Sequence, residues 1–108
     1  MGREGLQAFE LQVLLVALRL GEAAYSVPIV LELERQTGRR VSQAAVFIAL
    51  RRLEKRGLLV SQLDEASASH GRARRYVRLT PSAKQLLRET RDVQTRLWRG
   101  LNRVLGGR

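Results

Sequence analysis

The sequence predicts a mainly α-helical fold with one small β-hairpin. Three segments, 6–20, 26–37 and 42–56, carry apolar residues at the spacing of a helix that packs on a core. After Gly57 the apolar residues recur at every second position, which is typical of half-buried strands. A Thr-Pro pair at 80–81 then opens another helical segment. We therefore expect three helices, a hairpin and a long last helix, in that order.

The charge of the chain is strongly positive and unevenly distributed. Twenty Lys and Arg residues oppose ten Asp and Glu residues, which gives a formal net charge of +10. Residues 39–78 hold ten of the basic side chains and only three acidic ones. A polyanion is the expected partner, and nucleic acid is favoured over an anionic membrane because the basic residues lie in two separate segments.

Length and residue usage argue against several other classes of protein. A chain of 108 residues is expected to bury an adequate core without disulfides, and it contains no cysteine. The longest apolar run, 13–18, is too short to span a bilayer. The absence of cysteine favours the cytosol, so we expect a cytoplasmic, nucleoid-associated protein.

The first two helices are expected to form the base of the core. Segment 6–20 is apolar over more than half of its circumference, which favours a central buried helix. A connection at 22–25 has room for one brief extended segment. Ser26 is expected to cap the second helix, and Gly38 to end it. The four residues 39–42 then lead into the third helix, which is the spacing of a helix-turn-helix.

The third helix presents two different faces. Ser42 is placed to cap it, and its core stripe consists of Val46, Ala49, Leu50 and Leu53. The opposite face begins with uncharged side chains and becomes cationic, as in a helix that enters a DNA major groove. A solvated basic face is the alternative, and we expect Arg56, near the core edge, to be structural. The candidate DNA-binding residues here are Ser42, Gln43, Ala44, Phe47, Ile48, Arg51, Arg52 and Lys55.

Two alternating segments, 58–63 and 74–79, are expected to pair as a hairpin with a polar tip between them. Three further candidate DNA-binding residues, Arg72, Arg74 and Arg75, flank this tip. A basic wing of this kind grips phosphates or reaches into the minor groove. Because side chains alternate along a strand, Arg72 and Arg74 are the better candidates of the three.

The last helix begins at Pro81 and is expected to run for about 24 residues, roughly 36 Å at the rise of an α-helix. A core of this size cannot cover all of its apolar stripe, and soluble proteins rarely leave such a patch in water. We therefore expect a dimer interface in which Trp98 is an anchor. The candidate interface residues are Leu86, Leu87, Val93, Leu97, Trp98, Leu101 and Val104.

Catalysis and metal binding have little support in the sequence. The single histidine, His70, lies at the hairpin tip with no second ligand near it in the sequence, so it makes a poor metal site. No histidine or cysteine is placed to form a nucleophile–base pair, and no glycine-rich phosphate loop occurs. We expect no enzyme, no metal site and no cofactor.

Two blocks of the sequence carry the motif of a known family. The first reads VSQAAVFIALRRLEKRGLL at 41–59, and the second reads GRARRYVRLT at 71–80. Together they resemble the PadR family of bacterial transcriptional regulators, whose pattern is an aromatic residue followed by xxLxRLExxGLL, then a basic wing ending in RLT. The resemblance covers about residues 10–85. The chain departs from the family at Phe47, where tyrosine is usual, and near Ala44, where a glycine and a hydroxyl residue are usual.

The resemblance implies a winged helix-turn-helix with a long C-terminal dimerisation helix, divided into a DNA-binding domain at 1–79 and a dimerisation helix at 80–108. It implies a homodimeric repressor. Because a two-fold dimer would set its two recognition helices roughly 34 Å apart, one turn of DNA, we expect the operator to be an inverted repeat. Some family members bind planar aromatic compounds between their subunits, which makes Trp98 a candidate effector-binding residue. Two alternatives remain open: a basic architectural protein that coats double-stranded DNA without sequence preference, and a winged-helix module that binds another protein.

Overall fold

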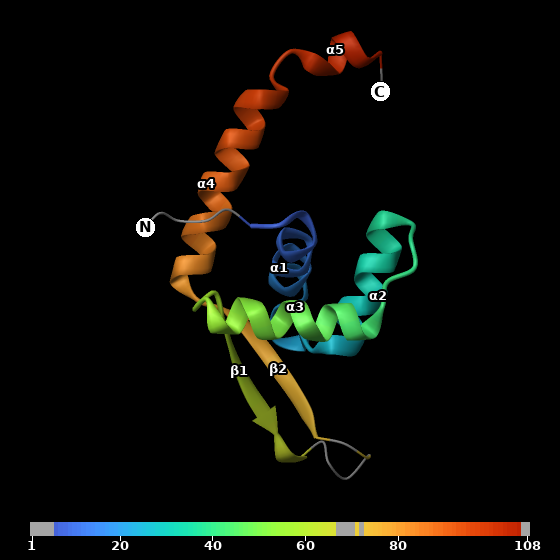
Figure 1. The fold of residues 1–108 in the computed structure, drawn as a ribbon, viewed down its shortest axis with the longest axis vertical. Helices are drawn as coiled ribbons and strands as arrows, with labels where there is room; N and C mark the ends of the chain where they lie inside the picture. The colour runs from blue at the N-terminus through green and yellow to red at the C-terminus, as the bar shows by residue number, and fades with distance from the viewer. Residues whose placement is uncertain (1–5, 67–70, 72, 107–108) are drawn as a thin grey trace.

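The computed structural model describes residues 6–66, 71 and 73–106 of the chain. Figure 1 shows the first three helices grouped together, the hairpin projecting away from them, and the last long helix leaving in another direction. The elements in chain order are α1 (Ala8–Leu20), the short 3-10 helix η1 (Gly21–Ala23), α2 (Ser26–Thr37), α3 (Gln43–Lys55), β1 (Leu59–Asp64), β2 (Arg74–Leu79), α4 (Pro81–Trp98) and α5 (Leu101–Leu105). The mainly helical fold with one hairpin, expected from the sequence, is confirmed.

The core lies where α1, α2 and α3 pack against one another and against the hairpin. Helix α1 supplies the fully buried Val13 and Leu14, which confirms that it is the central helix. Helix α2 contributes Ile29 and Leu33 from one stripe, since residues four apart share a helix face. The expected core stripe of α3 is confirmed as buried: Val46, Ala49, Leu50 and Leu53.

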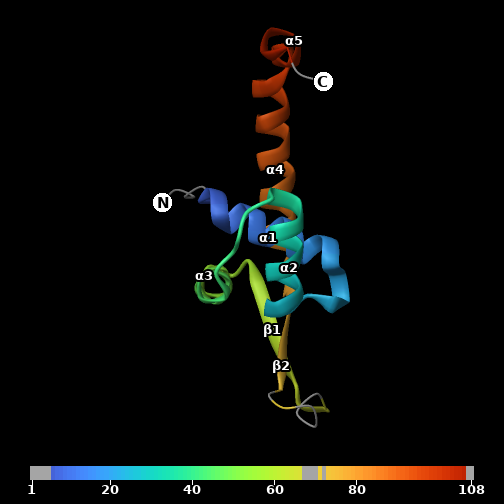
Figure 2. The same cartoon turned by 90° about the vertical axis from the view of Figure 1, so that its right-hand side faces the viewer.

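The hairpin is an antiparallel pair in which Leu59 lies opposite Leu79 and Asp64 lies opposite Arg74. Because side chains alternate along each strand, Leu59, Val77 and Leu79 point to one face and are buried. The far half of the hairpin extends beyond the helices, as Figure 2 shows, and its side chains there are more exposed.

A third extended segment lies along the free edge of β2. The Val77 amide donates a hydrogen bond to the Ala24 carbonyl at 2.9 Å, and Ala24 is extended and fully buried. The sequence predicted one brief extended segment in this connection, and Ala24 confirms it. The residues just before it form η1 and not part of a strand.

The expected cap of α2 is wrong. Ser26 is the first helical residue, and the N-cap position belongs to Tyr25, whose carbonyl accepts the Ile29 amide at 3.1 Å. The Tyr25 ring packs edge-on against Tyr76 with 5.2 Å between ring centroids. This contact with β2 fixes the extended backbone of Tyr25, so the helix begins one residue earlier than the serine alone suggests.

The other two helix starts expected from the sequence, at Ser42 and at the Thr80-Pro81 pair, are confirmed. The Ser42 hydroxyl accepts the Ala45 amide at 3.1 Å at the start of α3. The Thr80 hydroxyl accepts the Ala83 amide at 3.2 Å at the start of α4 and also donates to the Gly57 carbonyl at 2.8 Å. Thr80 therefore starts α4 and ties it to the end of the α3 segment.

The expectation of one continuous last helix is wrong. Helix α4 ends at Trp98, Gly100 adopts a left-handed conformation with φ of 80°, and the short α5 follows (Figure 1). A residue in the left-handed conformation interrupts the α-helical hydrogen-bond ladder, and glycine adopts this conformation without strain.

No helix among the described residues is both long and apolar enough to cross a membrane.

Candidate nucleic-acid interface

The outer face of α3 is open to solvent. Figure 2 shows α3 nearly end-on at the edge of the molecule, and no described element lies over its outer side. The side chains of this face and of the N-terminal end of α3 are all exposed: Ser42, Gln43, Ala44, Phe47, Ile48, Arg51, Arg52 and Lys55. The face is uncharged over its first half and cationic over its second half.

An aromatic and a basic side chain touch on this face. The Arg51 guanidinium lies over the Phe47 ring, 5.6 Å from its centroid. The two residues are one turn apart, so the helix itself brings them together. A cation held over an aromatic ring is stabilised by about 0.5–1 kcal/mol at an exposed site. The contact limits the directions in which Arg51 points.

The turn between α2 and α3 is fixed by side chains from the end of α2. The Glu34 carboxylate accepts the Val41 amide at 2.9 Å. The Thr37 hydroxyl donates to the Leu33 carbonyl at 2.7 Å and accepts the Arg39 amide at 3.3 Å. These bonds set the angle at which α3 follows α2. Glu34 was not among the candidates from the sequence, although an acidic residue near a helix C-terminus opposes the helix dipole and therefore suggests a specific partner.

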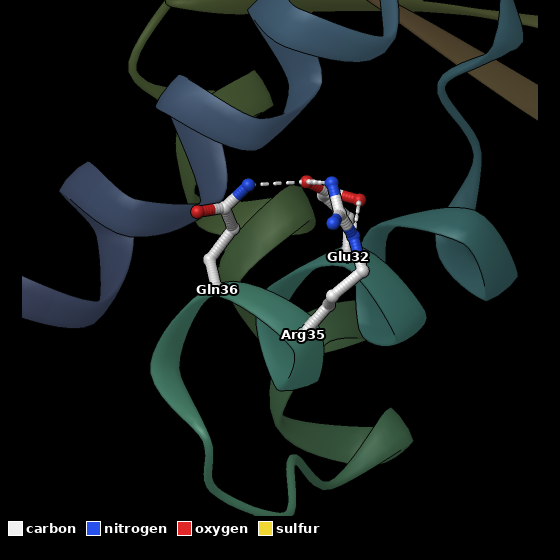
Figure 3. A network of polar contacts seen from close by, with 3 residues as sticks. All are labelled: Glu32, Arg35 and Gln36. Carbon is white, nitrogen blue, oxygen red and sulfur yellow. Dashed lines mark hydrogen bonds and ion pairs between the residues drawn. The ribbon is translucent and has the colours of Figure 1, made fainter.

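Glu32 and Arg35 of α2 are paired with each other (Figure 3). The Glu32 carboxylate accepts hydrogen bonds from Gln36 at 2.6 Å and from Arg35 at 3.2 Å. The bond from Gln36, with the bond from Arg35, lowers the pKa of Glu32 below its ordinary value, and the same carboxylate raises the pKa of Arg35. Arg35 is therefore partly neutralised by its own helix, and we do not count it among the interface cations.

An ion pair between a buried carboxylate and a partly exposed arginine anchors the C-terminal end of α3. The Arg56 guanidinium lies 3.5 Å from the Glu10 carboxylate of α1. The backbone N–H of Gln7 donates to the same carboxylate oxygen. Only 8% of the Glu10 side chain is exposed, against 33% for Arg56. The structural role expected for Arg56 is confirmed. Glu10 was not among the candidates from the sequence, although it lies on the buried apolar stripe of α1.

The hairpin arginines point to opposite faces. Arg75 donates to the Ser61 hydroxyl at 3.2 Å, and Ser61 donates to the Glu54 carboxylate at 2.8 Å, so Arg75 lies on the side of α3. Arg74 lies on the other face, with its guanidinium 4.9 Å from the centroid of the Tyr25 ring. A hydrogen bond with Tyr76 raises the pKa of Arg74, with a smaller effect from Tyr25.

Two of the residues singled out in the sequence, Arg72 and His70, lie outside the described residues. Of the three wing candidates, the structure therefore describes Arg74 and Arg75. Arg75 lies on the hairpin face beside α3, and Arg74 lies on the opposite face. No group of His, Cys, Asp and Glu side chains that could hold a metal ion occurs within the described part of the chain.

The candidate interface residues of the last helix fall into two groups. Leu87 is buried in the core of the single chain, and Leu86 is half-buried against it. The remaining candidates leave large exposed apolar surfaces in the single chain: Val93, Leu97, Trp98, Leu101 and Val104. The Trp98 indole N–H donates to the Gln94 side chain at 3.2 Å, so its polar edge is satisfied and its ring is free to pack.

A groove of about 720 Å³ lies between the hairpin, the end of α1 and the start of α4. Its lining includes Leu18, Val60, Tyr76, Arg78 and Lys84. Trp98 is not among the lining residues, so this groove is separate from the effector position expected from the sequence. The groove also borders the hairpin face that carries Tyr76, away from the α3 outer face.

Comparisons with known proteins identify the relatives of the chain. The model of the transcriptional regulator PadR-like family matches residues 14–89. Transcriptional regulator Rv3488 of Mycobacterium tuberculosis is 45% identical over 76 residues, which span 70% of this chain and 64% of that protein. A PadR family transcriptional regulator from Eggerthella lenta is 31% identical, with a TM-score of 0.68 over 90% of this chain and 87% of the other.

A third similar protein is Bordetella bronchiseptica BpsR, whose solved structure concerns the regulation of BpsR DNA binding by 6-hydroxynicotinic acid. It is 28% identical, with a TM-score of 0.65 over 94% of this chain and 72% of the other. The fold likeness thus includes the hairpin and most of α4.

Proposed function

This chain belongs to the PadR-like family of transcriptional regulators, and we propose that it represses transcription by binding operator DNA in a sequence-specific manner. The observation that carries the proposal is the outer face of α3, which is exposed, uncharged at its start and cationic at its end. Such a helix fits the major groove, where its first turns reach base edges and its later cations reach phosphates. The hairpin would contact the flanking backbone through Arg75 and its basic neighbours.

We propose further that two copies of the chain form the DNA-binding unit. The exposed apolar side chains of α4 and α5 are the kind of surface that monomeric proteins rarely leave in water. A two-fold axis along these helices would bury them and present two α3 helices to one face of DNA. The operator would then be an inverted repeat with half-sites about one helical turn, roughly 34 Å, apart.

An effector site is part of the same proposal. BpsR, which resembles this chain, has its DNA binding regulated by 6-hydroxynicotinic acid. The half-exposed Trp98 ring lies in the proposed interface and offers a flat surface for a small aromatic compound between two subunits. We propose this crevice, lined by Trp98 of both copies, as the place where such a compound would change the spacing of the two α3 helices.

One other function is favoured by a specific observation. The net charge of +10 suits a protein that coats DNA without sequence preference. The two functions differ in the ratio of specific to nonspecific affinity. We would select duplexes from a randomised pool. The affinity for the selected duplex would then be compared with the affinity for a shuffled duplex of equal length, at the same salt concentration.

The proposed function requires a ratio of about 10³ or more, as specific regulators show. A ratio near one would favour the coating protein. If no duplex is bound and the chain instead recovers a protein partner from a cell extract, the chain is a winged-helix interaction module.

A further inference from the structure

Two large apolar side chains lie side by side on the cationic helix α3. Phe47 is 53% exposed and Ile48 is 52% exposed, and neither takes part in the core. At 100° per residue, Ile48 lies near the centre of the outer face, and Phe47 lies on its flank. The described chain gives these two side chains no apolar cover, so both are open to contact with a partner.

The surroundings of this apolar pair indicate the chemistry of that partner. Arg51, Arg52 and Lys55 follow it along the same helix, and all three are exposed. An apolar groove on another protein would leave these cations without partners, whereas a DNA duplex supplies phosphates and, in its major groove, the acceptors of guanine. Ala44, one turn before Ile48, has a short side chain, so the helix backbone can approach the groove floor there.

The major groove offers one apolar group to such a helix. Among the four bases, only thymine carries a C5-methyl group on its major-groove edge. We propose that Phe47 and Ile48 form an apolar reader that selects thymine methyl groups in each half-site. The inference rests on the proposed function, since it requires that α3 enter the major groove.

The contact between Phe47 and Arg51 adds a geometric consequence. The guanidinium is held 5.6 Å from the ring centroid, so a thymine against Phe47 places Arg51 beside a neighbouring base pair. An arginine in that position recognises guanine through its two major-groove acceptors. The half-site would therefore contain a thymine next to or one step from a guanine on the strands that face α3.

The test removes only the methyl group. The probe is the duplex that the full-length protein selects from a randomised pool. It is remade as a set of duplexes, each with uracil in place of one thymine of one half-site. Uracil keeps the base pair and lacks the methyl group. We expect affinity to fall about fourfold at one or two positions, the factor that corresponds to one methyl group removed from an apolar contact.

The variants Phe47→Ala and Ile48→Ala should bind the thymine and uracil duplexes equally at the position that each residue reads. The matched control is Leu31→Ala, which removes an apolar side chain of α2 that is at least as exposed and should retain the full thymine preference. Thermal melting of each variant verifies that it is folded, which we expect because the replaced side chains lie outside the core.

The outcomes separate this inference from the proposed function. If the selected duplex is bound specifically but uracil has no effect at any position, the apolar reader is refuted and the regulator remains. If Phe47→Ala and Ile48→Ala both keep the thymine preference, another residue reads the methyl group and the inference is again refuted. If no duplex is bound above the shuffled control, the proposed function itself fails.

Discussion

The Glu10 carboxylate and the Arg56 guanidinium lie 3.5 Å apart and join the beginning of α1 to the end of α3. Because Glu10 is almost fully enclosed, Arg56→Ala should leave a buried carboxylate without its cation. A third of Arg56 is exposed, and water can therefore enter, so we expect a loss of about 1–3 kcal/mol in unfolding free energy. Urea denaturation of both proteins at one fixed protein concentration measures this loss of unfolding free energy.

A double variant tests the cause of that loss. Replacing both partners by apolar residues of similar length, Glu10→Leu with Arg56→Met, should cost less than Arg56→Ala alone, since no buried charge remains. A double variant that is as unstable as the sum of its two single variants would show that the pair is not coupled.

The bond from the Val41 amide to Glu34 predicts that α3 depends on α2 for its orientation. Glu34→Ala leaves a partly buried amide without an acceptor and should cost about 1–2 kcal/mol in stability. It should also weaken binding to the selected duplex more than to the shuffled one. Glu32→Ala is the matched control, because it makes the same chemical change on the same helix without touching the turn. Equal effects of the two substitutions on DNA binding would remove Glu34 from the account.

The two faces of the hairpin predict different roles for its arginines. Arg75 lies on the α3 side, so Arg75→Gln should make the slope of log affinity against log salt shallower by about 0.9 for one lost phosphate contact. Arg74 lies over Tyr25 on the other face, and Arg74→Gln should leave the slope unchanged. Titrations at several salt concentrations measure both slopes. The opposite pattern would restore the preference for Arg74 that strand alternation alone suggested.

The exposed stripe of α4 predicts that dimerisation and operator binding fail together. Leu97 is 64% exposed in the single chain, and Leu97→Asp would place a charge in the proposed interface. Sedimentation should show a shift from dimer to monomer, with operator binding lost at concentrations that saturate the parent. Thr95→Asp adds the same charge on the opposite side of the helix and should change neither property. A monomeric Leu97→Asp protein that binds the full operator with parental affinity would contradict the proposal.

Local patterns in the sequence predicted those features of the fold that local chemistry decides. Ser42 and Thr80 cap their helices because each hydroxyl reaches an amide three residues away. Ser26 failed as a cap because the packing of Tyr25 on a distant strand fixes where α2 begins. The break at Gly100 was missed because the apolar stripe continues beyond it, and apolar spacing alone does not reveal a change of direction.

The residues of the candidate DNA interface also divide into those that a local pattern placed correctly and those that depend on distant contacts. Helical periodicity placed Phe47, Ile48 and Arg51 on one outer face, and they are exposed. The Glu10–Arg56 pair and the orientation of Arg75 depend on contacts between segments far apart in the chain, which no local pattern contains. Strand alternation showed that Arg74 and Arg75 point apart, but only the packed structure shows which of them lies beside α3.

The central claim is that the outer face of α3 reads base sequence, and selection of duplexes from one randomised pool by two proteins tests it most directly. The parent should enrich an inverted repeat. Arg51→Ala should enrich the same repeat with one position of each half-site relaxed, and it should lose roughly 1–3 kcal/mol of binding free energy for a bidentate guanine contact. An identical consensus from both proteins, or no consensus from the parent, would contradict the claim.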